Sequence, residues 1–271
     1  MSYFLTDDNT KLYYETTGEG NKTILFIHGW SANHLFFKKQ IQVLKNDYKV
    51  VSYDLRGHGL SEEPKNGYTI PRYAQDLKNL IDYFSLKSVV LVGWSMGTDI
   101  IFDYIKQFGC DNVEKIIIMD MTARLITDEN YKVGLYGKFS HEDNLNTMVA
   151  MNENWKEFVN VFVPAIFAKS GCKNKEDLKW TYEEENKNSA TVMTRMWVTM
   201  SSQDYRDILP KITVPTLITF GEESGLYPRE NSEYLRDMIK GSKMVGFSNC
   251  GHSLMLEDPD KFNNEVKNFV G

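Results

Sequence analysis

The chain has 271 residues, of which 42% are hydrophobic and 25% are charged, and its formal net charge is −6 at pH 7. These values are typical of an ordinary globular protein that can bury a sizeable core, as one large α/β domain or as a core with a smaller insertion. They argue against a general nucleic-acid-binding protein, which would have a basic surface, and no stretch approaches the roughly 20 apolar residues of a membrane span.

The first 84 residues predict an antiparallel hairpin followed by alternating strands and helices. Residues 3–16 alternate weakly between two turn clusters, which predicts a hairpin at a sheet edge. Apolar runs and helical periodicity then predict strands over 23–27 and 49–54 and helices over 35–45 and 70–84. The segment from Asp54 to Ser61 is charged and rich in glycine, and we interpret it as a tightly turned structural loop.

The stretch 89–101 joins a strand pattern to a helix pattern through Gly93-Trp94-Ser95-Met96-Gly97. The aliphatic run before this pentapeptide predicts a strand buried on both faces, and apolar residues at helical spacing follow it. The chain must turn sharply between the two, and glycines at 93 and 97 let the backbones pass without Cβ clashes. We therefore predict that Ser95 lies at the apex of the turn, with a strained backbone and an exposed hydroxyl.

The second half of the chain interrupts and then resumes the strand and helix alternation. A strand is predicted over 113–120 and ends in Asp120, whereas residues 123–208 show no alternation and predict a helical insertion of several short helices. The alternation resumes with strands over 212–220 and 242–247 and helices over 230–240 and 259–270. Segments 1–122 and 209–271 thus predict one α/β core with a mostly parallel sheet flanked by helices.

A serine hydroxyl needs a base within hydrogen-bond reach to act as a nucleophile near neutral pH. His252 follows the last predicted strand in a loop, at the end of the sheet where ligands of α/β proteins bind, and it is the candidate base. His28 and His58 lie in glycine-flanked turns, where we expect buried, hydrogen-bonded rings. Cys250 lies on the loop of His252 and is interpreted as a packing residue rather than a thiol nucleophile.

Five motifs spread over nearly the whole chain match a known family. They are His28-Gly29-Trp30, Asp54-x-Arg56-Gly57-x-Gly59-x-Ser61, Gly93-Trp94-Ser95-Met96-Gly97, Val214-Pro215-Thr216-Leu217 before Gly221, and Gly251-His252 followed by Leu256-Glu257. By these motifs the chain resembles the α/β-hydrolase superfamily, in particular its esterase and peroxidase-like branch with a lid. The resemblance implies an α/β-hydrolase fold in which the helical insertion 123–208, placed after the strand that ends at Asp120, forms the lid.

The resemblance also assigns roles to residues of this chain. It implies that Ser95 is the nucleophile and that His252 is the base. It further implies that the backbone N–H groups of Trp30 and Met96 form the oxyanion hole, where two donors face the charge that develops on the carbonyl oxygen. Met96 suits this role because the residue after the nucleophile begins a helix whose first N–H groups are unpaired.

The third member of the triad departs from the family pattern. The acid of this branch usually lies in a Gly-x-x-Asp-x-x-x-Pro segment, and the matching segment here, from Gly221 to Pro228, has Ser224 at the acid position. A serine cannot supply the negative charge that stabilises the imidazolium. Asp120, at the end of the preceding core strand, is the favoured replacement, and Glu223 is the alternative acid. A third interpretation is an incomplete triad in a repurposed site.

These observations predict a serine hydrolase that cleaves a small to medium carboxylic ester, or an activated acyl compound, through an acyl-enzyme on Ser95. The same triad could instead support perhydrolysis, acyl transfer or C–C bond hydrolysis, because features outside the triad decide among these reactions. A hypothesis of another class is a non-catalytic ligand-binding protein on the hydrolase scaffold. The serine at position 224 is its only support.

Partners and location can also be predicted. We expect a small-molecule ester or acyl substrate and neither a cofactor nor a metal, because no cluster of ligating residues is apparent. The three scattered cysteines predict neither a disulfide framework nor a zinc site. Together with an N-terminus that lacks the features of a signal peptide, they predict a cytoplasmic protein. The oligomeric state stays open, although the aromatic residues of the insertion hint at self-association.

Overall fold

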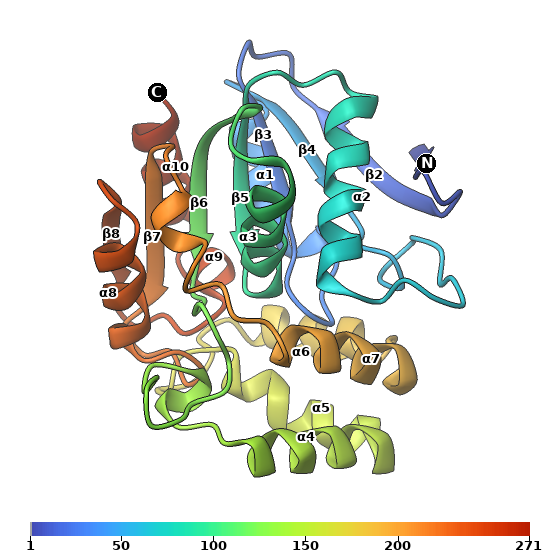
Figure 1. Cartoon of the computed structure of the whole chain (residues 1–271), viewed down its shortest axis with the longest axis vertical. Helices are drawn as coiled ribbons and strands as arrows, with labels where there is room; N and C mark the ends of the chain where they lie inside the picture. The colour runs from blue at the N-terminus through green and yellow to red at the C-terminus, as the bar shows by residue number, and fades with distance from the viewer. Residues whose placement is uncertain (1) are drawn as a thin grey trace.

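The computed structural model describes residues 2–271 and contains one eight-stranded sheet at its centre (Figure 1). The strand order is β1-β2-β4-β3-β5-β6-β7-β8. β2 runs antiparallel to both of its neighbours, and β3 to β8 pair in parallel. The strands are β1 (Ser2–Leu5), β2 (Lys11–Thr17), β3 (Thr23–Ile27), β4 (Lys49–Tyr53), β5 (Val89–Trp94), β6 (Val113–Met119), β7 (Thr216–Gly221) and β8 (Lys243–Phe247). The predicted parallel sheet with a hairpin at one edge is confirmed.

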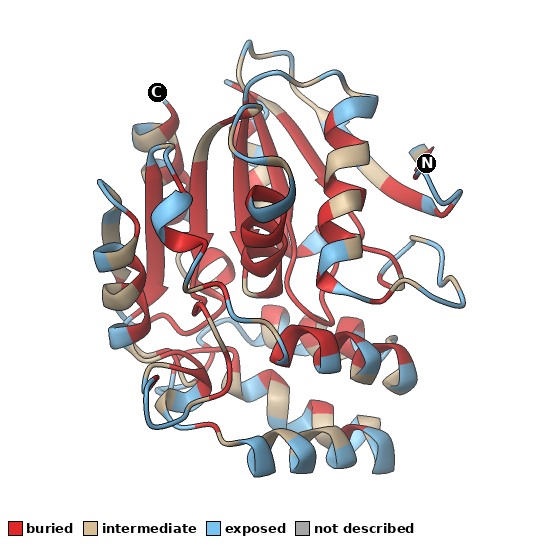
Figure 2. Ribbon diagram, viewed as in Figure 1, coloured by how far each residue is buried: buried red, intermediate tan, exposed pale blue. Residues whose placement is uncertain are grey.

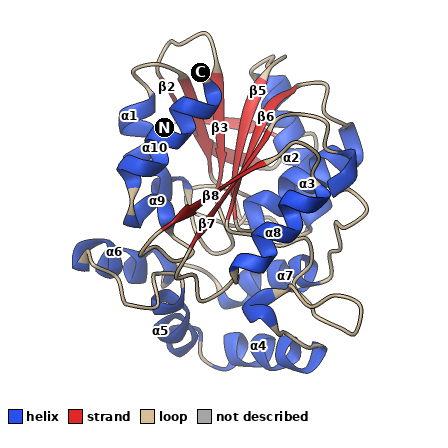
Figure 3. Ribbon diagram, turned by 90° about the vertical axis from the view of Figure 1, so that its left-hand side faces the viewer, coloured by secondary structure: helices blue, strands red, loops and turns tan. Residues whose placement is uncertain are grey.

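Helices cover both faces of the sheet, as its apolar central strands require. Every residue of β3, β5 and β7 is buried (Figure 2). One face is covered by α1 (Lys38–Leu44), the short α9 (Leu254–Glu257) and α10 (Pro259–Val270) (Figure 3). The other face is covered by α2 (Ile70–Tyr83), α3 (Met96–Phe108) and α8 (Arg229–Met238). Among the described residues, no helix has the length and the apolar content to cross a membrane.

Four further helices follow β6 and precede β7 in the chain. They are α4 (His141–Glu153), α5 (Trp155–Ala165), α6 (Lys175–Glu185) and α7 (Ala190–Ser201). In Figure 1 these helices lie together beyond the carboxyl ends of the parallel strands. The expected helical character of this stretch is therefore confirmed, and its position places it over the end of the sheet where ligands of α/β proteins bind.

Two local features differ from the sequence-based expectations. β7 begins at Thr216 rather than at Ile212, because Pro215 has no N–H to donate to the ladder and residues Leu209–Lys211 form a short 3₁₀ helix instead. α9 was not predicted, since a helix of one turn is too short to show helical periodicity.

Arg56 is fully buried and anchors the loop after β4. Its guanidinium donates two hydrogen bonds of 2.6 Å to the carboxylate of Asp76 on α2 and two longer ones, of 3.0 and 3.2 Å, to Asp8. Asp76 also accepts from Arg72 at 2.7 Å. The predicted structural role of this loop thus corresponds to a buried ion-pair network that joins the N-terminal hairpin, the loop and α2.

His28 follows β3 and is fully buried in its neutral form. Its Nδ1–H donates to the Gly29 carbonyl at 2.8 Å, and its Nε2 accepts from the Leu55 N–H at 3.0 Å. A second proton on Nε2 would face the Leu55 N–H and would lose this bond. Burial lowers the pKa of His28 from 6.5 to about 4, although Asp54 acts in the opposite direction. The expectation of a buried, hydrogen-bonded ring is confirmed.

Acid should destabilise the protein through His28. Between pH 6.5 and pH 4 the unfolded chain binds a proton at this residue that the folded protein does not, so stability falls as the pH falls. The shift corresponds to about 3 kcal/mol of unfolding free energy at pH 4. We expect His28→Gln to remove about this much of the pH-dependent loss in urea unfolding between pH 7 and pH 4. The exposed His141, changed to Gln, is the control, and an unaltered pH dependence in His28→Gln would contradict the prediction.

Candidate active site

Ser95 lies at the sharp turn between β5 and α3. Its backbone has φ = 53° and ψ = −124°, a conformation that costs a non-glycine residue conformational energy. The turn is held by hydrogen bonds from the Ser95 N–H to the Met119 carbonyl at 3.0 Å and from the Thr98 N–H to the Ser95 carbonyl at 2.7 Å. The Ser95 side chain is half-buried, whereas its neighbours on both sides are buried. The predicted strained apex is confirmed.

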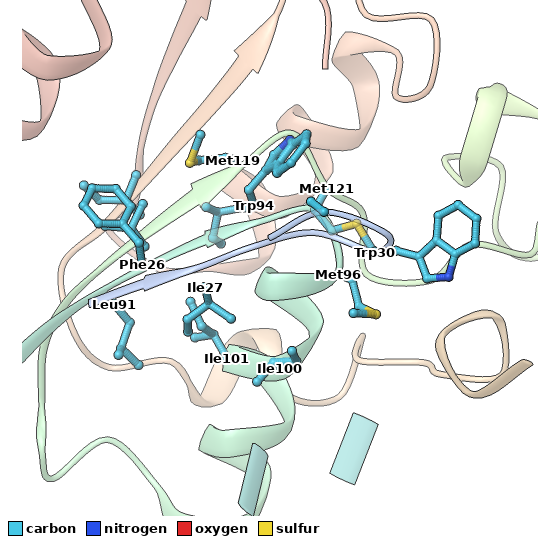
Figure 4. Packing of buried hydrophobic residues seen from close by; sticks show 14 of the residues in the cluster. Phe26, Ile27, Trp30, Leu91, Trp94, Met96, Ile100, Ile101, Met119 and Met121 are labelled. Carbon is cyan, nitrogen blue, oxygen red and sulfur yellow. The ribbon is translucent and has the colours of Figure 1, made fainter. Parts of the chain in front are cut away.

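Two glycines allow this turn to pack tightly. A Cβ atom on Gly93 would lie 2.7 Å from the Gly97 carbonyl oxygen, and one on Gly97 would lie 2.2 Å from the Ile27 carbonyl oxygen. Such distances are shorter than any real Cβ contact, so both positions require glycine. Figure 4 shows apolar residues packed around this turn, among them Ile27 of β3 and Ile100 and Ile101 of α3.

His252 and Asp120 form a buried pair beside this turn. The His252 Nδ1 lies 2.7 Å from Oδ2 of Asp120, and both residues are at most 2% exposed. Nδ1 therefore carries the proton and donates it, which leaves Nε2 free to accept another. The His252 backbone carbonyl accepts from the Trp94 indole at 2.9 Å, and its ring packs between Trp94 and Tyr227 at centroid distances of 5.3 and 5.4 Å. The imidazole is thus fixed on three sides.

The structure separates the two candidate acids. Asp120 contacts His252, whereas Oε2 of Glu223 accepts from the Ser170 N–H at 2.9 Å. Hydrogen bonds from Ser170 lower the pKa of Glu223. Ser224, at the family's acid position, donates its hydroxyl to Oδ2 of Asp120 at 2.7 Å. The carboxylate of Asp120 therefore holds both Ser224 and His252 through one oxygen.

The two predicted oxyanion donors lie at adjacent elements. Met96 is the first residue of α3, and Trp30 follows Gly29 in the loop after β3. Within residues 2–271, neither backbone N–H donates a hydrogen bond to another protein group. Two unpaired N–H groups next to a candidate nucleophile are what an oxyanion hole requires.

Ser95, His252 and Trp30 open into one cavity that helices α5 to α7 also line. The cavity has an empty volume of about 440 Å³, including the open space at its mouth. Its other lining residues are mostly aromatic or aliphatic: Gly29, Trp94, Leu135, Tyr136, Phe162, Ile166, Glu185, Trp197, Met200, Leu226 and Tyr227. The structure thus brings the predicted nucleophile, base and one predicted oxyanion donor to a shared apolar space.

Two buried polar residues of the cavity were not predicted from the sequence. Tyr227 is fully buried, which raises the pKa of its hydroxyl well above the usual value, while a hydrogen bond with Ser95 lowers it. Its place in the segment that matches the family's acid motif was the only available signal. Glu185 lies at the end of a highly charged helix, and no motif marked it.

Cys250 is a buried thiol on the loop of His252. Burial raises the pKa of this thiol to about 12, so the thiolate is scarce near neutral pH and the packing interpretation is supported. In the part of the chain that the structure describes, no three His, Cys, Asp or Glu side chains are grouped so that they could hold a metal ion.

The strands, the helices and the turn at Ser95 together match a known family. A family model described as "alpha/beta hydrolase fold" matches residues 22–259. The chain belongs to the α/β-hydrolase family. This match covers the strained turn, the buried pair and the helices from α1 to α9.

Among the relatives of this α/β hydrolase is "AB hydrolase superfamily protein YisY" of Bacillus subtilis, 28% identical over 98% of each chain. Another is "Bifunctional esterase/perhydrolase DCH" of Acinetobacter calcoaceticus, 25% identical over 100% of this chain and 99% of the relative. A solved esterase from Exiguobacterium antarcticum is 28% identical and superimposes with a TM-score of 0.92. The match covers 99% of this chain and 98% of the esterase. The similarity therefore extends over the whole length.

Proposed function

We propose that this α/β hydrolase is a serine esterase that acts through an acyl-enzyme on Ser95. The observation that carries the proposal is the buried pair of Asp120 and His252, whose histidine lines the same cavity as the strained Ser95. A nucleophile, a base and an acid that orients the base are the minimum for this chemistry. The names of the esterase relatives support the same reaction class.

The geometry supports a two-step mechanism. Nε2 of His252 takes the proton of the Ser95 hydroxyl while Oγ attacks the ester carbonyl carbon, and the carboxylate of Asp120 stabilises the imidazolium. The N–H groups of Trp30 and Met96 hold the oxyanion of the tetrahedral intermediate. When this intermediate collapses, the alcohol leaves with the proton from His252. A water molecule, activated by His252, then releases the acid and restores Ser95.

The helical segment supplies the rest of the proposed site. We assign residues 123–208 as a lid inserted into the core formed by 1–122 and 209–271, because α4 to α7 lie beyond the carboxyl ends of the strands. Of these helices, α5, α6 and α7 contribute Phe162, Glu185 and Trp197 to the cavity. Apolar walls exclude water and favour a small to medium acyl or aryl ester over a polymer.

Perhydrolysis is the second candidate reaction, and the name of the Acinetobacter relative favours it. Hydrogen peroxide would replace water in the attack on the same acyl-enzyme and would release a peracid. In acyl transfer, an alcohol would instead attack the acyl-enzyme and would release a new ester. Perhydrolysis is distinguished from hydrolysis by measuring peracid formation from an ester and hydrogen peroxide in parallel with ester hydrolysis.

A fluorophosphonate should label Ser95 stoichiometrically. This reagent phosphonylates a serine only where a base activates the hydroxyl, so mass spectrometry should find one adduct on the peptide that contains Ser95. Ser95→Ala should abolish the adduct, whereas Ser224→Ala should still be labelled on Ser95. If the folded protein remained unlabelled, the proposal would be wrong and a ligand-binding protein would become the better interpretation.

A further inference from the structure

The proposed mechanism leaves one buried acid of the cavity unused. Glu185 is the last residue of α6, is 1% exposed, and lines the cavity together with Ser95 and His252. Its Oε2 atom has no hydrogen-bond partner among the described residues. The carboxylate of the preceding Glu184, in contrast, accepts from Asn33 at 2.8 Å and from Lys187 at 2.6 Å. Of two consecutive acids, one is paired and the other faces the cavity.

Among the described residues, the cavity offers Glu185 no permanently charged cation. No lysine or arginine is among the described residues that line it. The three indole N–H groups of its wall are already used, because Trp30 donates to the Met193 carbonyl, Trp94 to the His252 carbonyl and Trp197 to Asn144. A buried polar atom without a partner is costly, so a ligand that supplies the missing hydrogen bond gains this energy on binding.

Burial favours the uncharged form of the Glu185 carboxyl group. Burial raises the pKa of Glu185 well above its ordinary value, a hydrogen bond with Ser31 lowers it, and the neighbouring Glu184 raises it. A protonated carboxyl both donates and accepts a hydrogen bond. A hydroxyl group of a ligand has the same dual capacity and therefore complements it.

The main chain of Glu185 is tied to the candidate oxyanion loop. Asn188 donates to the Ser31 carbonyl at 2.6 Å and to the Glu185 carbonyl at 3.2 Å, and Ser31 directly follows Trp30. These hydrogen bonds fix the backbone of Glu185, from which the carboxyl group extends, relative to the loop that contains Trp30. Because Trp30, Ser95 and Glu185 line the same cavity, a substrate bound at Ser95 places its remaining atoms in the space that this carboxyl group lines.

We propose that Glu185 is a specificity-determining residue that binds an uncharged hydroxyl group on the substrate. The preferred substrates are then hydroxylated esters, with the hydroxyl on the acyl or on the alcohol part, rather than purely aliphatic esters. This inference rests on the proposed esterase function. A site built to bind a hydroxyl group discriminates against the analogue that has a methyl group in its place, because its own polar atom then stays unpaired.

Matched ester pairs test this assignment on both parts of the substrate. The first pair is p-nitrophenyl 3-hydroxybutanoate and p-nitrophenyl 3-methylbutanoate, and the second is 2-hydroxyethyl acetate and propyl acetate. In each pair a hydroxyl replaces a methyl group. We expect the ratio of kcat/KM values within at least one pair to fall by about tenfold in Glu185→Leu, which corresponds to the loss of one hydrogen bond. Glu185→Gln, which keeps an uncharged donor and acceptor, should retain most of the preference.

Three controls distinguish hydroxyl binding by Glu185 from a structural role and from cation binding. Glu184→Gln should leave both ratios unchanged. If Glu185 had only a structural role, Glu185→Leu would also leave both ratios unchanged. Unchanged ratios in Glu185→Leu, in protein whose Ser95 still reacts with fluorophosphonate, would overturn the inference and leave the esterase proposal intact. A wild-type preference for acetylcholine over 3,3-dimethylbutyl acetate that Glu185→Gln abolishes would show an ionised carboxylate that binds cations, and would also overturn it. Absent labelling of wild-type Ser95 would instead reject the esterase proposal itself.

Discussion

Asp120→Asn should lower kcat for p-nitrophenyl butanoate by about 10⁴-fold, which is the loss that the corresponding change causes in a serine protease. The amide of asparagine can donate to Nδ1 of His252, which favours the tautomer with the proton on Nε2. This tautomer cannot accept the proton of Ser95. The Asn side chain is also uncharged and cannot stabilise the imidazolium. KM should change far less than kcat.

The exchange of two residues provides a second test of the acid. Oδ2 of Asp120 lies 2.7 Å from both Nδ1 of His252 and Oγ of Ser224, so a carboxylate at position 224 can reach the same imidazole. Asp120→Ser combined with Ser224→Asp should therefore recover at least tenfold in kcat over Asp120→Ser alone. Glu223→Gln serves as the control and should leave kcat within about twofold of wild type. Near-normal turnover in Asp120→Asn would rule out Asp120 as the acid.

Arg56→Met should lower the free energy of unfolding by about 3 kcal/mol, the lower end of the range for breaking a buried ion pair. The substitution keeps much of the side-chain volume but removes the partner of two 2.6 Å hydrogen bonds to Asp76. Asp76 retains Arg72, which limits the loss. Urea unfolding measures the effect, and for a chain of this size the melting temperature should fall by about 6–12 °C.

Two variants test whether the ion pair is the cause. Arg72→Met removes a more exposed partner of Asp76 and should cost less than Arg56→Met. The double variant Arg56→Met with Asp76→Leu removes both buried charges and should be more stable than Arg56→Met alone. If the double variant lost as much stability as Arg56→Met and Asp76→Leu lose together when each is measured alone, packing rather than charge would set the cost.

The sequence predicted the sheet and the turn at Ser95 because their signals are local. A buried strand and a helix joined by Gly93 and Gly97 leave few alternatives, and the close approaches of both glycines confirm the reason given for them. β7 was predicted to begin too early because the apolar pattern continues through Pro215, where hydrogen bonding cannot.

The choice between the candidate acids depended on side-chain direction, which a single sequence does not encode. Asp120 and Glu223 both follow core strands, but Glu223 turns toward the N–H of Ser170, a residue of the helical segment far away in the chain. Glu185 was missed for a related reason. It ends the run Glu183-Glu184-Glu185, a pattern typical of a solvated helix end, but tertiary packing that includes a hydrogen bond from the Trp155 indole to the Glu185 carbonyl buries it. The catalytic role of Asp120 stays a prediction until kcat is measured.

The position of the helical segment between two paired strands has a consequence for the synthesis of the protein. β6 pairs with β7 in the register Ile117 to Leu217, so the β6 edge stays unpaired while the ribosome adds the whole of α4 to α7. The turn at Ser95 can form long before translation reaches His252, close to the C-terminus. On the proposed function, a nascent chain thus presents Ser95 before its proposed base, and activity can begin only after the segment that contains His252 has left the exit tunnel. During that interval the open edge, rather than the finished fold, sets the risk of aggregation.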